Sequence, residues 1–152
     1  MSMQTVVNDH LVGYEIVNPK GSRTLLVLHG WGHKASYWLP LVKLLPQKLR
    51  IVLLDLPGFG QSDFLSGIAG VPEYTEFVED FIKKMGLKKP IILGHSFGGQ
   101  IAMYLVAKNS QLVSHLILLS PAGIRTKTTK QKIKIFLYKR FKGLKMFLPT
   151  PI

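Results

Sequence analysis

The sequence predicts an α/β fold, in which a mostly parallel sheet carries flanking helices. Short runs of Leu, Ile and Val without polar alternation recur along the chain, which is typical of strands buried on both faces. Segments with apolar residues at three- and four-residue spacing separate these runs, and strands that alternate with helices form parallel sheets. The length of 152 residues suffices for one domain with its own core.

Six strands are expected. A hairpin opens the chain, since residues 6–7 and 11–17 are apolar and residues 8–10 between them are suited to a tight turn. Four apolar runs follow as candidate parallel strands, at residues 24–28, 51–54, 91–93 and 116–119.

Three helices are expected between the strands. Residues 38–45 suggest a short one. Residues 72–82 show clear three-four spacing, with Pro72 near the first turn and Gly86 as a stop signal. Residues 97–108 form the third helix, which opens with small residues.

Charge and composition exclude several function classes. The net charge of +12 is local, because all eight acids precede position 81 and residues 125–145 hold nine Lys or Arg and no acid. The absence of cysteine excludes disulfides, zinc-thiolate sites and thiol nucleophiles, and the five scattered histidines show no metal-ligand spacing. We expect no metal and no cofactor. The chain shows no signal peptide and no membrane span, so a cytoplasmic location is the expectation.

The third parallel run leads directly into Gly94-His95-Ser96-Phe97-Gly98, a Gly-x-Ser-x-Gly motif between a strand and a helix. A sharp strand-to-helix reversal strains the serine backbone and leaves no room for side chains two residues away, hence Gly94 and Gly98. Ser96 is therefore the candidate nucleophile of an elbow that also contains His95. The Phe97 N–H at the helix start is a candidate oxyanion donor.

The loops after the first two parallel runs complete the candidate site. After the first, the Trp31 N–H is the best second oxyanion donor, and Gly30 would let the chain approach closely. After the second, Asp55 can be interpreted as a triad acid. A structural role is favoured, in which its carboxylate binds N–H groups of the following turn.

Three motifs in register resemble the α/β-hydrolase family over about residues 6–125. They are His29-Gly30-Trp31, Asp55-x-Pro57-Gly58-x-Gly60-x-Ser62 and Gly94-His95-Ser96-x-Gly98-Gly99. Ser120-Pro121-Ala122-Gly123 also resembles the esterase, peptidase and carbon–carbon hydrolase members. The resemblance implies Ser96 as the nucleophile, Trp31 and Phe97 as oxyanion donors and Asp55 as a structural residue.

The remainder of a catalytic triad is missing. In this fold an acid and then a histidine follow the serine, yet residues 97–152 contain no Asp or Glu and one histidine, His115. His115 precedes a strand and is expected at the wrong edge of the sheet, whereas His33 and His95 are interpreted as local packing or polar contacts. We expect residues 1–124 to be the N-terminal part of a hydrolase core, truncated where a cap region begins at residues 125–152.

The expected function is hydrolysis of an ester, amide or carbon–carbon bond in a small-molecule substrate through an acyl-enzyme on Ser96, in an incomplete or inactive chain. Residues 116–119 would form an unpaired apolar edge that favours self-association. Residues 126–148 are amphipathic and basic. They are interpreted as a cap helix with a solvated face, or alternatively as a helix on an anionic membrane. Nucleic-acid binding is not expected, because no recognised module accompanies the charge.

Two other functions remain open. A non-catalytic binding protein of the same fold would explain the missing acid and histidine. Dinucleotide binding is suggested by Gly-x-Gly-x-x-Ala at residues 30–35, with Asp55 near the position of a ribose-binding acid. The bulk of Trp31 and the presence of Pro40 in the following helix weigh against it, and the elbow would be left unexplained.

Overall fold

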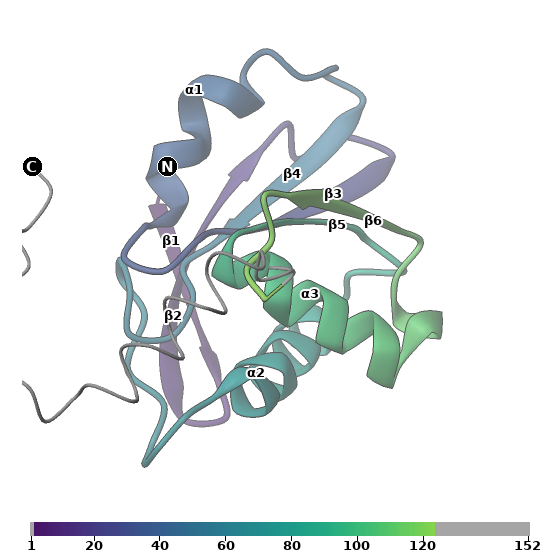
Figure 1. Ribbon diagram of the computed structural model, residues 1–152. Coiled ribbons are helices and arrows are strands. Elements are labelled where there is room, and N and C mark those ends of the chain that lie inside the picture. Colours follow the sequence, from purple (N-terminus) through teal and green to yellow (C-terminus); the bar gives the residue numbers. More distant parts are fainter. Residues whose placement is uncertain (1, 124–152) are drawn as a thin grey trace, which may run out of the picture.

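The computed structural model describes residues 2–123, which fold around one six-stranded sheet with helices on both faces (Figure 1). The strands are β1 (Ser2–Val7), β2 (His10–Val17), β3 (Arg23–Leu28), β4 (Leu49–Leu54), β5 (Ile91–His95) and β6 (His115–Leu119). The helical elements are η1 (Ala35–Trp38), α1 (Leu39–Val42), α2 (Val71–Lys84), α3 (Phe97–Lys108) and η2 (Ser110–Leu112). The predicted α/β fold is confirmed.

The strand order is β1-β2-β4-β3-β5-β6, and β4, β3, β5 and β6 run parallel. The β1–β2 hairpin joins them through an antiparallel pairing of β2 with β4. Its turn consists of two residues, Asn8 and Asp9, with φ of 48° and 64°, the geometry that matches strand twist. The expected three-residue turn is therefore wrong by one position, because His10 already pairs with Val7.

Alternate residues of the parallel strands enter two separate cores. On one face, β-strand residues such as Leu26 and Val52 pack with α2 and α3. On the other face, their neighbours Leu25 and Ile51 pack with Trp38 and Val42 of η1 and α1. Burial on both sides explains why these strands read as continuous apolar runs.

Helix α2 begins and ends at the expected signals. The Glu73 side chain accepts a hydrogen bond of 2.7 Å from the Gly70 N–H, Pro72 lies in the first turn, and Gly86 follows the last turn with φ of 59°. The hydrogen bonds from backbone N–H groups also lower the pKa of Glu73.

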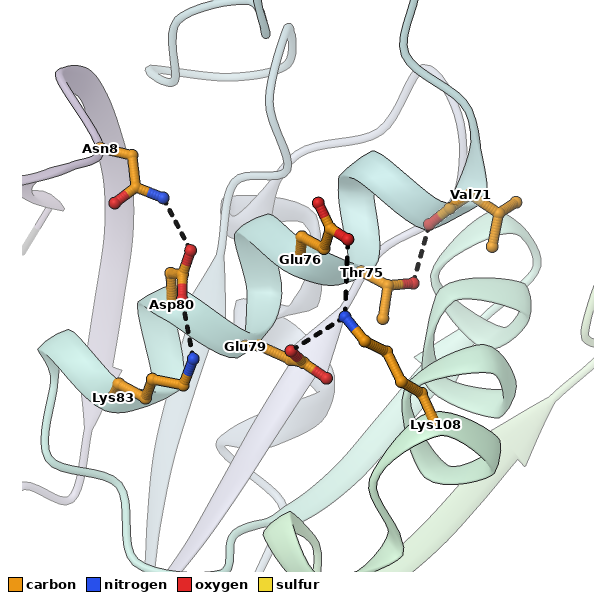
Figure 2. Close-up of polar contacts among 8 residues, drawn as sticks. All are labelled: Asn8, Val71, Thr75, Glu76, Glu79, Asp80, Lys83 and Lys108. Carbon is orange, nitrogen blue, oxygen red and sulfur yellow. Dashed lines mark hydrogen bonds and ion pairs between the residues drawn. The ribbon is translucent and has the colours of Figure 1, made fainter.

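A set of polar contacts joins α2 to α3 and to the hairpin (Figure 2). Lys108 of α3 lies 3.3 Å from Glu79 and 3.6 Å from Glu76 on α2, and its hydrogen bond with Glu79 raises the pKa of the Lys108 amine. Asp80 accepts hydrogen bonds from Lys83 at 3.0 Å and from Asn8 at 2.7 Å, which lower the pKa of its carboxyl group. The helices are thus fixed relative to each other and to the sheet.

Strand β6 is the edge strand of the described sheet, next to β5 (Figure 1). Its Ile117 and Leu119 side chains are 41% and 39% exposed. No helix within residues 2–123 has the length and apolarity to span a bilayer. The cap and membrane interpretations of the basic segment fall on residues 125–152, which lie outside the described residues.

Candidate active site

Ser96 lies at the sharp turn where β5 ends and α3 begins. Its φ of 51° is in the left-handed region that non-glycine residues rarely adopt. Three backbone hydrogen bonds hold this conformation. The Ser96 N–H donates to Leu119 at 3.1 Å, and the Ser96 carbonyl accepts from Gln100 at 3.1 Å and from Ala122 at 2.8 Å. The loop after β6 therefore helps to fix the elbow.

The glycines on either side of Ser96 have no room for a side chain. A Cβ on Gly94 would lie 2.6 Å from the carbonyl oxygen of Gly98, and a Cβ on Gly98 would lie 2.6 Å from that of His29. Because the obstructing atoms are backbone atoms, they cannot rotate away. The Gly98 N–H also donates to the His29 carbonyl at 3.1 Å, so α3 rests directly on the end of β3.

The loop after β3 passes close to Ser96. A Cβ on Gly30 would lie 3.2 Å from the Ser96 Cβ, tighter than most real contacts. The His33 N–H donates to the Gly30 carbonyl at 3.1 Å and Gly32 has φ of 73°, which together make a tight turn of residues 30–33. The absence of a side chain at Gly30 is what permits this approach.

His29 fixes the orientation of this loop and was missed as a site residue. The Leu56 N–H donates to its Nε2 at 3.0 Å, so the ring proton sits on Nδ1 and is donated to the Gly30 carbonyl at 2.8 Å. Burial lowers the pKa of the His29 imidazole and favours this neutral form. The Gly30 carbonyl and the Trp31 N–H belong to one planar trans peptide, so His29 also sets the direction of that N–H.

Two backbone donors near Ser96, the candidate nucleophile, are left free. Within the described part of the chain, neither the Trp31 N–H nor the Phe97 N–H has a hydrogen-bond acceptor. Phe97 is the first residue of α3, where N–H groups lack an intrahelical partner and the helix dipole favours negative charge. Trp31 follows Gly30, which lies close to Ser96, and Phe97 follows Ser96 directly. Two free N–H groups at these positions suit the binding of an oxyanion that develops next to Ser96.

Asp55 holds two loops together at the end of β4. Its buried carboxylate accepts the Ala35 N–H at 2.6 Å and the Gln61 N–H at 3.0 Å, and its carbonyl accepts the Ser62 hydroxyl at 2.7 Å. Both carboxylate oxygens are thus occupied by backbone donors. The hydrogen bond from Gln61 is the one expected of a structural turn residue. The hydrogen bond from Ala35 also joins this turn to the loop that leads into η1.

Aromatic side chains form a wall beside the elbow. The Trp31 ring lies edge-on to Phe59 at 5.1 Å and to Phe97 at 5.3 Å between centroids, and Phe97 contacts Tyr74 at 5.0 Å. The Tyr74 hydroxyl donates to the Pro57 carbonyl at 3.1 Å, which fixes the far end of the wall. Trp31 nevertheless stays 66% exposed, so the wall presents an apolar surface next to Ser96.

Among residues 2–123, no histidine is hydrogen-bonded to the Ser96 hydroxyl. His115 starts β6, and its ring lies 3.4 Å from the Arg23 side chain at the opposite edge of the sheet. His95 stacks on His33 at 5.7 Å and meets Trp38 edge-on at 5.8 Å. No group of three or more metal-ligating side chains gathers among residues 2–123.

The dinucleotide interpretation lacks its helix. Residues 30–35 lead into the four-residue η1 and then into the four-residue α1. A pyrophosphate site of that kind needs a longer helix opening at the glycines. The glycines of this loop instead serve the tight turn and the close approach to Ser96.

Comparisons with known proteins agree with this geometry. Residues 23–145 match the family model described as alpha/beta hydrolase fold. The chain is 34% identical over 121 residues to human monoacylglycerol lipase ABHD6, covering 76% of this chain and 35% of the lipase. It is 32% identical over 113 residues to the uncharacterized hydrolase YugF of Bacillus subtilis, covering 74% of this chain and 41% of YugF. The chain thus spans well under half of these relatives.

Two solved structures share the fold. One is a membrane phospholipase A described as a bacterial virulence factor, with a TM-score of 0.76, 26% identity and coverage of 99% of this chain and 54% of that one. The other is a putative lipase from Acinetobacter baumannii AYE, with a TM-score of 0.76, 25% identity and coverage of 100% and 56%.

Proposed function

The chain belongs to the alpha/beta hydrolase fold family, and we propose that it carries the nucleophile and the oxyanion donors of a serine hydrolase. In this proposal the Ser96 hydroxyl oxygen attacks the carbonyl carbon of an ester, amide or activated carbon–carbon substrate, and its proton passes to a base, which then gives it to the leaving group. The Trp31 and Phe97 N–H groups stabilise the tetrahedral oxyanion, and its collapse expels the leaving group to give an acyl-enzyme. The strained Ser96 backbone beside Gly30 is the observation that carries the proposal.

Activation of Ser96 needs a base, and no side chain within residues 2–123 is hydrogen-bonded to the Ser96 hydroxyl. Residues 97–152 contain no carboxylate, and His115 lies at the far edge of the sheet. A serine hydroxyl is a weak nucleophile at its free pKa, although an oxyanion hole alone retains part of the catalysis. We therefore expect residues 1–152 alone to turn over slowly, and full activity to require a histidine and an acid in addition.

The aromatic wall favours a substrate with an apolar chain. Trp31, Phe59 and Phe97 offer apolar surface beside the nucleophile, and burying an alkyl chain against them is favourable by ~0.8 kcal/mol per CH₂. Monoacylglycerol lipases and a phospholipase among the similar proteins support the same choice. We propose an ester of an apolar acyl chain as the substrate class.

Chemical rescue tests the proposed nucleophile. The chain is incubated with a fluorophosphonate probe in the presence and absence of imidazole, which supplies a base from solution. Labelling that rises with imidazole, maps to Ser96 by peptide mass spectrometry and is lost in Ser96→Ala is expected. Imidazole-dependent labelling that persists in Ser96→Ala, or no labelling at Ser96 under any condition, contradicts the proposal.

A non-catalytic binding protein is the second candidate, favoured by the lack of an acid and a placed histidine after Ser96. It predicts that an alkyl ester raises the melting temperature of the chain without being cleaved, even with imidazole present. A small-molecule ligand and a cytoplasmic location remain predictions in both cases.

A further inference from the structure

A hollow lies at the sheet edge opposite Ser96, where the parallel strands begin. Its volume is about 500 Å³, within the usual range of small-ligand sites, and it is open to solvent. Two loops line it, one between β2 and β3 and one before β4: Asn18, Pro19, Lys20, Gly21, Ser22, Gln47 and Lys48. None of these residues takes part in the candidate active site.

The two loops are held firmly against each other. The Ser22 N–H donates to the Lys48 carbonyl at 3.1 Å, and the Gly21 N–H donates to the Asn18 carbonyl at 3.0 Å. A side chain on Gly21 would overlap the backbone of Arg50, so the loops touch without an intervening side chain. The exposed Lys20 and Lys48 amines therefore extend from two fixed pieces of backbone.

The whole edge around the hollow is basic and free of acids. The chain segments that form it are residues 18–23, 46–50, 86–91 and 113–115, at the starts of β3, β4, β5 and β6. Together they hold six Lys or Arg, one histidine and no Asp or Glu. Parallel pairing brings these strand starts to one edge, so their positive potentials add over the hollow.

Arg50, at the start of β4, is a further cation of this edge. Its Nε is buried and has no hydrogen-bond partner among the residues that the structure describes. A buried guanidinium nitrogen without an acceptor is unfavourable unless an acceptor arrives from outside. The backbone of Arg50 contacts Gly21, although Arg50 is not one of the residues that line the hollow.

We propose that this hollow binds a phosphate group, with Lys20 and Lys48 as its charge partners and the Ser22 hydroxyl as a neutral donor. A phosphate monoester or pyrophosphate matches the site better than a carboxylate, because it carries more charge and more acceptor oxygens for several donors at once. The phosphate belongs to a soluble ester or to a lipid headgroup, and the two sources are separable by experiment.

The test follows backbone amides of the full chain by ¹H–¹⁵N NMR during titration with pyrophosphate. A parallel arm measures co-sedimentation with phosphatidylcholine vesicles that contain or lack phosphatidic acid. The variant Lys20→Met/Lys48→Met removes both amines at exposed positions. Lys34→Met/Lys43→Met is the matched control, since it loses the same charge from exposed lysines that do not line the hollow.

Pyrophosphate shifts at Lys20–Ser22 and Lys48, weakened about tenfold in the hollow variant but not in the control, support a soluble ligand. Vesicle binding that needs phosphatidic acid and is lost only in the hollow variant supports a headgroup. Equal binding by both variants, shifts confined to other residues, or no binding in either arm overturns the proposal.

Discussion

At the scale of single residues, the candidate site is held by the strained Ser96 backbone and by the hydrogen bonds of the buried His29 ring. The elbow and its glycines follow from one motif, because a strained serine and two side-chain-free neighbours leave a readable signature. His29 stands in the His29-Gly30-Trp31 motif, but the motif does not reveal the role of its ring, since a histidine between an apolar strand and a glycine has no pattern that reveals a tautomer. Its hydrogen bonds to Leu56 and Gly30 appear only when two distant loops meet.

Gly98→Ala should destabilise the fold by about 1–3 kcal/mol, the usual cost of overpacking, because the new Cβ meets the backbone carbonyls of Leu28 and His29. Gly70→Ala is the control, since its Cβ would meet only side-chain atoms, Glu73 Oε2 at 3.4 Å and Pro72 Cδ at 3.7 Å. Urea unfolding followed by circular dichroism measures both. A small and equal loss of unfolding free energy in Gly98→Ala and Gly70→Ala would show that α3 can shift away from β3.

Asp55→Asn should cost about 1–3 kcal/mol, because an amide has one oxygen for two N–H donors, the buried one of Ala35 and the part-buried one of Gln61. The free energy of unfolding in urea is again the measurement. A variant as stable as the native chain would contradict the structural role assigned to this carboxylate.

His29 should make the fold sensitive to acid. Burial depresses its pKa below the reference value of 6.5, so below that pH the unfolded chain binds a proton that the folded chain excludes. Its contribution to stability is present above pH 6.5 and is lost as the pH falls through the folded-state pKa. His29→Gln should be less stable at neutral pH and should lose part of this pH dependence.

Unfolding curves of the native chain and of His29→Gln across this pH range provide the measurement. Identical pH dependence in both chains would mean that other groups, and not His29, bind the proton on unfolding.

At the scale of elements, the predicted strands and helices are present, but their first and last residues differ from the predicted ones. The apolar runs identified β3, β4, β5 and β6, but β3 starts at Arg23, β4 at Leu49 and β6 at His115. Backbone pairing continues past the apolar residues at the solvated edge, where side chains need not be apolar. The position of β4 between β2 and β3 depends on long-range pairing that no local pattern encodes.

The β6 edge gives a prediction at this scale. Ile117→Lys should reduce self-association of the chain, because a charge on a half-exposed edge strand opposes edge-to-edge pairing. Leu44→Lys, at an 81% exposed position on the α1 side, should change it less. Light scattering against protein concentration compares the two. An equal effect of both variants would assign the association to general hydrophobicity and not to the edge.

At the scale of the whole molecule, the parallel sheet separates two kinds of chemistry. The ends of its strands carry the strained serine, the free N–H groups and the aromatic wall. The starts of its strands carry the cations and the hollow. The motifs that mark the family lie at the first edge and predicted its chemistry. The basic edge was not predicted, because its cations are scattered in the sequence and come together only through the parallel pairing of the strands.

In the proposed function, the folded chain presents Ser96 for attack before any base is supplied. The most direct measurement is the rate of Ser96 labelling by a fluorophosphonate with a fixed imidazole concentration, for the folded chain and for the same chain unfolded in urea. Preorganised oxyanion donors predict faster labelling in the folded chain by about 10³-fold, the residual catalysis of an oxyanion hole and binding. Equal rates in the folded and unfolded chains would contradict the account.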